Sequence, residues 1–204
     1  MISLKELLSE VTYKSEVLRL SRDFINHFKK SFGKKYSYTD MAQGPGVDEL
    51  GDPIEFDLSI KLVPTKNLKG NPFSIEGGAE FDEMDLTVKY NPIVFPAAYN
   101  DFIAEIKETF RHEMEHISQG QKGTIKFEER GDKPFYQYLL LRQEVPAFIK
   151  GLNKRAKTKK ITLGQAFEEF FKDYKDSFKN QKEIDIVRKE WIKWAEKNLP
   201  KTKL

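Results

Sequence analysis

The amino-acid sequence predicts an α+β protein in which one helix precedes a small, mostly antiparallel sheet and several helices follow it. Apolar residues recur at three- and four-residue spacing near the N-terminus, and again from about residue 97 to the end. The residues between these helical stretches, about 35–95, combine strand-like alternation with many turn signals. Because helices and strands are segregated along the chain, the pattern indicates α+β rather than alternating βα units.

The first helix is expected over residues 1–30, and Ser31-Phe32-Gly33 ends it. Two stretches of the sheet region alternate apolar and polar residues, Ile54–Leu62 and Met84–Tyr90, as half-buried strands do. Glycine and proline predict turns around them, at Gly44-Pro45-Gly46, Gly51-Asp52-Pro53, Gly70-Asn71-Pro72 and Gly77-Gly78.

The second half of the chain is predicted to be helical. A helix over 98–119 stops at Gly120, and a polar loop leads to a helix over 143–157 that carries Pro146 in its first turn. Thr162 is the expected N-cap of a helix with an apolar stripe, which we interpret as core: Phe167, Phe170, Phe171, Tyr174 and Phe178. A last helix carries Trp191 and Trp194. We expect a main domain over 1–160 and a helical C-terminal extension over 161–204.

Composition excludes several kinds of chemistry. The 204 residues include no Cys and three His, so disulfides, thiolate nucleophiles and Cys-bound metals are ruled out. The net charge of +3 conceals an uneven distribution, because residues 150–204 hold sixteen basic and eight acidic residues and the remainder is acidic. No secretory signal or membrane-spanning apolar run is visible, which predicts a cytoplasmic protein with no membrane partner.

Residues 112–116 read His-Glu-Met-Glu-His, an H-E-x-x-H motif. The four-residue spacing places His112 and His116 one helical turn apart on one face, where both rings can bind one zinc ion. Glu113 is then beside the first ligand, placed to take a proton from an activated water. Two of the three histidines fall in this one arrangement, and they border the apolar stripe of their helix. These observations favour a metal site over a solvated helix face.

A catalytic zinc needs a third protein ligand, which cannot be Cys here. His27 is the only other histidine and is expected to be partly exposed. The remaining candidates are downstream carboxylates: Glu128, Glu129, Asp132 and Glu144. The first three lie in a polar loop, whereas Glu144 opens a helix that would hold it in place, and it follows His116 by 28 residues.

Two segments carry a resemblance to a known family. Phe110–Gln119 resembles the active-site helix of zincin metallopeptidases, and Tyr138–Phe148 resembles the segment from which gluzincin-type members supply a glutamate ligand. In that pattern Ala follows the Glu by three residues, as Ala147 follows Glu144, although Pro146 between them departs from it. The nearest likeness is to small H-E-x-x-H proteins of tailed bacteriophages. The resemblance covers about residues 80–155.

The resemblance implies a zinc-dependent metallopeptidase acting on a peptide or protein. It assigns the zinc to His112, His116 and Glu144, and the role of general base to Glu113. It also implies that an extended peptide lies along a sheet edge above the active-site helix, and by position that edge would be the Met84–Tyr90 strand. Three residues near Glu144 are candidates to stabilise the oxyanion: Tyr136, Tyr138 and Arg142.

A second hypothesis is a catalytically silent, virion-associated assembly protein on a zincin scaffold, with the basic C-terminal helices binding a viral or structural protein partner. A basic cluster could bind nucleic acid, but we interpret it as a helix end with cations near its C-terminus: Lys150, Lys154, Arg155, Lys157, Lys159 and Lys160. Acidic residues before the presumed edge strand would favour basic substrates if they lined the cleft: Glu76, Glu80, Asp82, Glu83 and Asp85.

Overall fold

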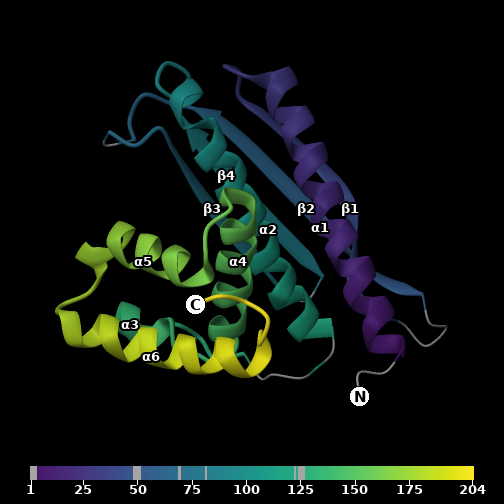
Figure 1. The fold of residues 1–204 in the computed structure, drawn as a ribbon. Coiled ribbons are helices and arrows are strands. Elements are labelled where there is room, and N and C mark those ends of the chain that lie inside the picture. Colours follow the sequence, from purple (N-terminus) through teal and green to yellow (C-terminus); the bar gives the residue numbers. More distant parts are fainter. Residues whose placement is uncertain (1–3, 48–51, 69, 81, 122, 124–126) are drawn as a thin grey trace. The chain divides into compact units, whose positions relative to one another are not determined.

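The computed structural model describes residues 4–47, 52–68, 70–80, 82–121, 123 and 127–204, and the side chains of 4–14 and 45–47 lie outside that description (Figure 1). The chain forms two compact units, Met1–Thr124 and Ile125–Leu204. The sequence placed its domain boundary at 160, whereas these units divide at 124. The predicted class is confirmed, since a helix, a sheet and then further helices follow one another. None of the described helices has the length and apolar character to cross a membrane.

The first unit contains two long helices and a four-stranded sheet. Its elements in chain order are α1 (Leu4–Ser31), β1 (Tyr36–Val47), β2 (Pro53–Pro64), β3 (Phe73–Ala79), β4 (Glu83–Tyr90), the short 3₁₀ helix η1 (Phe95–Ala98) and α2 (Tyr99–Gln121). The two strands predicted from alternation are β2 and β4. The sequence pattern did not delimit β1 or β3.

The sheet has the strand order β1-β2-β4-β3. β1 pairs with β2 and β3 pairs with β4 in antiparallel fashion, while the central β2 and β4 are parallel. The expected peptide-binding edge at Met84–Tyr90 is therefore wrong, because β4 has a neighbour on each side. The edge next to β4 is β3, which contacts α2.

Two of the predicted turns are parts of strands. Gly44-Pro45-Gly46 lies within β1, where the register with β2 shifts between Gln43 and Val47, and an edge strand tolerates proline at such an irregularity. Gly77-Gly78 lies within β3, in register with Leu86 and Asp85 of β4. Gly70-Asn71-Pro72 does lie in the connection between β2 and β3, with Gly70 at φ +88°. Of Gly51-Asp52-Pro53, Gly51 is outside the described residues.

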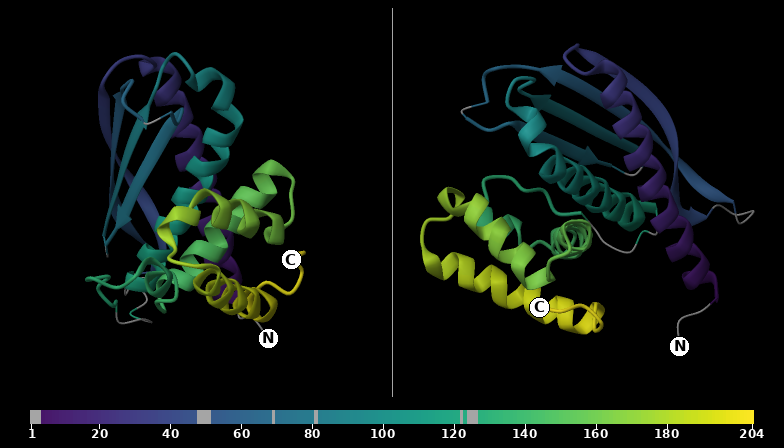
Figure 2. Two further views of the ribbon diagram at one scale, coloured as in Figure 1. Left: turned by 90° about the vertical axis from the view of Figure 1, so that its left-hand side faces the viewer. Right: turned by 45° about the horizontal axis from the view of Figure 1, so that its top comes forward.

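Helices α1 and α2 cover one face of the sheet (Figure 2). Along β2 the side chains alternate as predicted, with Phe56, Leu58, Ile60 and Leu62 buried and the residues between them exposed. α2 contributes a matching apolar stripe that includes Phe102, Ile106, Phe110 and Ile117. The core of the first unit is thus one layer between the sheet and two helices, and it fixes how α2 is rotated.

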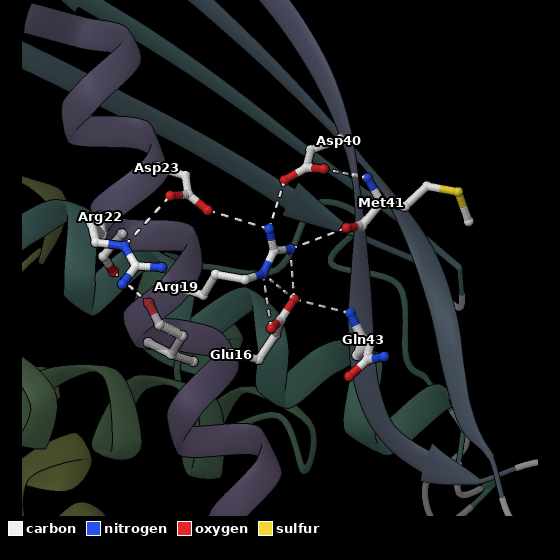
Figure 3. A network of polar contacts seen from close by, with 9 residues as sticks. Glu16, Arg19, Arg22, Asp23, Asp40, Met41 and Gln43 are labelled. Atoms are coloured by element: carbon white, nitrogen blue, oxygen red, sulfur yellow. Dashed lines mark hydrogen bonds and ion pairs between the residues drawn. The ribbon is translucent and has the colours of Figure 1, made fainter.

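The free edge of β1 is partly closed by side chains (Figure 3). Arg19 of α1 donates to Glu16 at 2.7 Å, to Asp40 at 3.0 Å and to the backbone carbonyl of Met41 at 3.0 Å. The backbone N–H of Met41 donates to Asp40, and that of Gln43 donates to Glu16. These bonds satisfy edge groups that would otherwise invite another strand.

The second unit is helical, with α3 (Phe135–Tyr138), α4 (Glu144–Lys159), α5 (Leu163–Asp173), the 3₁₀ helix η2 (Lys175–Ser177) and α6 (Gln181–Asn198). Thr162 is the N-cap of α5 as predicted, in a capping box with Gln165. The aromatic stripe is core, apart from Tyr174, which is exposed. Phe167, Phe170 and Phe171 surround the indole of the fully buried Trp191.

The basic cluster lies on α4 and at its C-terminal end, as predicted. Lys159 and Arg155 both pair with Glu169 of α5, at 2.9 Å and 3.5 Å. Lys160 ends the helix in the left-handed conformation, at φ 59°. Part of the positive charge in this segment is therefore neutralised within the second unit.

Candidate metal centre

The H-E-x-x-H motif lies in the C-terminal half of α2. Packing of the apolar stripe against the sheet turns this face of the helix so that Glu113 and His116 are buried and His112 is half-buried. The Nε2 atoms of His112 and His116 are 3.1 Å apart, and the two rings stand at 75° to one another. The structure therefore confirms that the two histidines meet on one face of a helix.

This geometry suits a shared metal ion. Two nitrogen ligands at about 2.0–2.1 Å from a tetrahedral zinc would be about 3.3 Å apart, close to the separation of the two Nε2 atoms. The Nδ1 atom of His116 lies 3.3 Å from Oε1 of Gln119. If Nδ1 carries the proton and donates to Gln119, the lone pair of Nε2 is left for the metal, as in many metal sites.

The electrostatic surroundings keep His112 in its ligating form. Burial lowers the pKa of His112 well below its ordinary value of 6.5, and the neighbouring His116 and Arg111 lower it further. Since only a neutral imidazole can bind a metal, this shift favours binding at neutral pH.

The two glutamates of the motif have different surroundings. Glu115 pairs with Arg111 one turn earlier, at 3.1 Å. Glu113 is buried and lies against β3, because a methyl group on Gly77 would come within 2.6 Å of its Oε1. The carboxylate predicted to act as a base thus adjoins an edge strand, whereas the other carboxylate forms an ion pair on the helix.

The edge strand β3 has open backbone groups next to Glu113. Asn91 N donates to Pro72 O, and Glu80 N donates to Glu83 O. In the antiparallel register with β4, these bonds mean that the even-numbered residues of β3 direct their N–H and C=O groups to β4. Ile75 and Gly77 direct theirs to the free edge, where no hydrogen-bond partner is found within the described part of the chain.

Glu144 is the first residue of α4, is 6% exposed, and has Pro146 within the same first turn. Proline is tolerated there because the N–H groups of a first turn have no helical partner. The competing loop carboxylates Glu128, Glu129 and Asp132 are all exposed. Burial at a helix start thus distinguishes Glu144 from the other carboxylates that the sequence offered.

Other predicted residues play different parts. The half-buried His27 has its Nδ1 3.0 Å from the hydroxyl of Tyr36 and stacks on Tyr38, with ring centroids 4.0 Å apart. Of the oxyanion candidates, Tyr136 and Tyr138 are half-buried and Arg142 is exposed. The acidic residues Glu76 and Asp85 are exposed. They lie on the face of the sheet that α1 and α2 do not cover, because side chains alternate along a strand and the neighbouring residues face the helices.

The predicted ligand set joins His112 and His116 of the first unit to Glu144 of the second unit, and Glu144 as the third ligand stays a prediction. Two imidazoles and a carboxylate suit zinc and also other first-row metals, so the donors alone do not identify the ion. Gly77 is the residue of this region that sequence reasoning missed, because the Gly77-Gly78 pair was interpreted as a turn.

Comparisons with protein-family models, with curated proteins and with solved structures found no match to this chain. The fold and the motif geometry are therefore the grounds on which a function can be argued.

Proposed function

We propose that this protein is a zinc-dependent metallopeptidase of the zincin type. The observation that carries the proposal is the arrangement on α2, where two Nε2 atoms lie 3.1 Å apart and the buried carboxylate between them in sequence adjoins an open strand edge. His112, His116 and Glu144 would hold the metal. A bound zinc ion supplies Lewis acidity, which polarises a carbonyl and lowers the pKa of water.

The chain's own residues would then transfer the protons and bind the substrate. Glu113 takes a proton from the attacking water and delivers it to the leaving nitrogen as the peptide bond breaks. The substrate lies extended along β3, pairing with the open groups of Ile75 and Gly77. This pairing places a peptide carbonyl near Glu113, because Gly77 is the strand residue that adjoins its carboxylate.

The test combines metal analysis with cleavage of a broad peptide library. We expect stoichiometric zinc in the wild-type protein, the same zinc in Glu113→Gln without cleavage, and loss of zinc in His116→Ala. Zinc binding without any cleavage would overturn the enzymatic proposal and favour the assembly-protein alternative.

The third ligand is tested separately. Glu144→Gln should weaken zinc binding strongly, because a carboxylate is a better ligand than a neutral amide. Glu128→Gln is the matched control, since Glu128 is exposed in the loop before α3. Equal zinc affinity in the two variants would remove Glu144 from the ligand set while leaving the histidine pair in place.

A further inference from the structure

The edge strand β3 comes close to the motif at Gly77. A methyl group on Gly77 would lie 2.6 Å from Oε1 of Glu113 and 3.0 Å from Cγ2 of Thr109. Favourable separations between such atoms are about 3.5 Å or more, so alanine does not fit here unless the strand or a side chain moves. Glu113 therefore occupies space that any other residue at position 77 would need.

The backbone conformation does not explain this glycine. Gly77 is not among the glycines with positive φ, and it lies in regular register with Leu86 of β4. Its neighbour Gly78 is equally exposed, but a methyl group there would meet nothing within 4 Å. The two adjacent glycines thus differ in what lies beside them, since Glu113 and Thr109 of α2 adjoin Gly77 and the Glu113 carboxylate is the closer of the two.

We propose that Gly77 is a positioning residue for Glu113: its missing side chain leaves the space that holds the carboxylate against the free edge of β3. The same residue directs its N–H and C=O groups to that edge. A glycine at this position lets the proton-accepting oxygen and the backbone that pairs with substrate approach each other closely. The catalytic consequence rests on the proposed peptidase function, whereas the packing relation does not.

The first experiment measures stability and needs no activity. The melting temperature is compared for Gly77→Ala and Gly78→Ala, each in the wild-type background and in the Glu113→Ala background. We expect Gly77→Ala to lower the melting temperature more than Gly78→Ala does. Most of that difference should disappear once the Glu113 carboxylate is removed, since neighbouring residues are energetically coupled.

The inference is overturned if the loss caused by Gly77→Ala is the same in both backgrounds. If Gly77→Ala alone does not fold, the double variant with Glu113→Ala decides, and it must fold as Gly78→Ala does. A double variant that also fails to fold would equally overturn the inference.

The second experiment measures turnover and zinc content. A general base must stay within hydrogen-bond reach of the proton it takes, and a displacement of about 1 Å can cost roughly 100-fold in rate. Gly77→Ala should lower kcat by about that factor with KM and bound zinc little changed, while Gly78→Ala keeps wild-type kcat. A rise in KM alone would contradict the positioning role. A wild-type protein without hydrolysis would refute the proposed function but leave the stability test decisive.

Discussion

Replacing Arg19 by methionine should destabilise the first unit by about 2 kcal/mol. The guanidinium donates to Glu16, Asp23 and Asp40 and to the carbonyl of Met41. Its hydrogen bond to Glu16, which outweighs desolvation, raises the pKa of Arg19 above its ordinary value, so the charge is permanent. In the Arg19→Met variant, the carboxylate of Glu16 would keep only the backbone N–H of Gln43 as a partner in this network. Glu16 is only 7% exposed, so its lost hydrogen bonds are not fully replaced by water.

The size of the effect follows from exposure. A hydrogen bond to a charged group contributes about 1.5–3 kcal/mol, whereas exposed ion pairs add about 1 kcal/mol or less, and the half-buried pairs to Asp23 and Asp40 are closer to the second kind. With the Arg19 side chain 33% exposed, we take the lower part of this range. For a chain of this length, about 2 kcal/mol corresponds to a fall in melting temperature of roughly 4–8 °C.

Circular dichroism is a more suitable assay than tryptophan fluorescence, because the first unit contains no tryptophan. Both tryptophans, Trp191 and Trp194, belong to the second unit. Arg22→Met is the control, since that side chain is 72% exposed and approaches Asp23 only at 3.6 Å. The difference between the variants should shrink at about pH 3, where most carboxylates are protonated. Equal losses for Arg19→Met and Arg22→Met at neutral pH would refute the reasoning.

Three further outcomes are expected. In metal-free protein the free energy of unfolding should fall as pH drops below about 6.5, because the unfolded chain binds a proton at His112 that the folded chain does not. The measurement is the urea midpoint at about pH 5 and at about pH 7.5. The fall between these two values should be smaller for His112→Gln than for the wild-type protein. Trp191→Ala should cost about 4 kcal/mol and Trp194→Ala clearly less in urea unfolding, since only Trp191 is fully buried. Zinc at about 100 times its Kd should raise the free energy of unfolding by about 2.7 kcal/mol, and chelation or His116→Ala should abolish that gain.

Much of the fold could be predicted because its signals are local. Alternation over a few residues predicted β2 and β4, and helical spacing predicted α2 with an apolar stripe, which the structure packs into the core. The capping role of Thr162 and the tolerance of Pro146 likewise depend only on neighbouring residues. These features survive folding because tertiary packing reinforces the same local preferences.

The sheet edges could not be predicted in the same way. Strand order depends on pairings between distant segments, so nothing in Met84–Tyr90 shows that β2 and β3 lie on either side of it. Gly77-Gly78 has the composition of a turn, yet pairing with β4 draws it into a strand. A prediction from neighbouring residues in the sequence cannot identify Glu113, which is distant in the chain, as the reason for a glycine at position 77.

The sequence alone therefore specified the two histidines and the glutamate of the motif, because an i, i+4 pair on a helix meets at one point whatever surrounds it. It also narrowed the third ligand to carboxylates, since the chain has no Cys. Only the tertiary structure decided that β3 is the open edge and that Gly77 adjoins Glu113. These are contacts between segments some 36 residues apart in the chain, and they arise from the packing of α2 on the sheet.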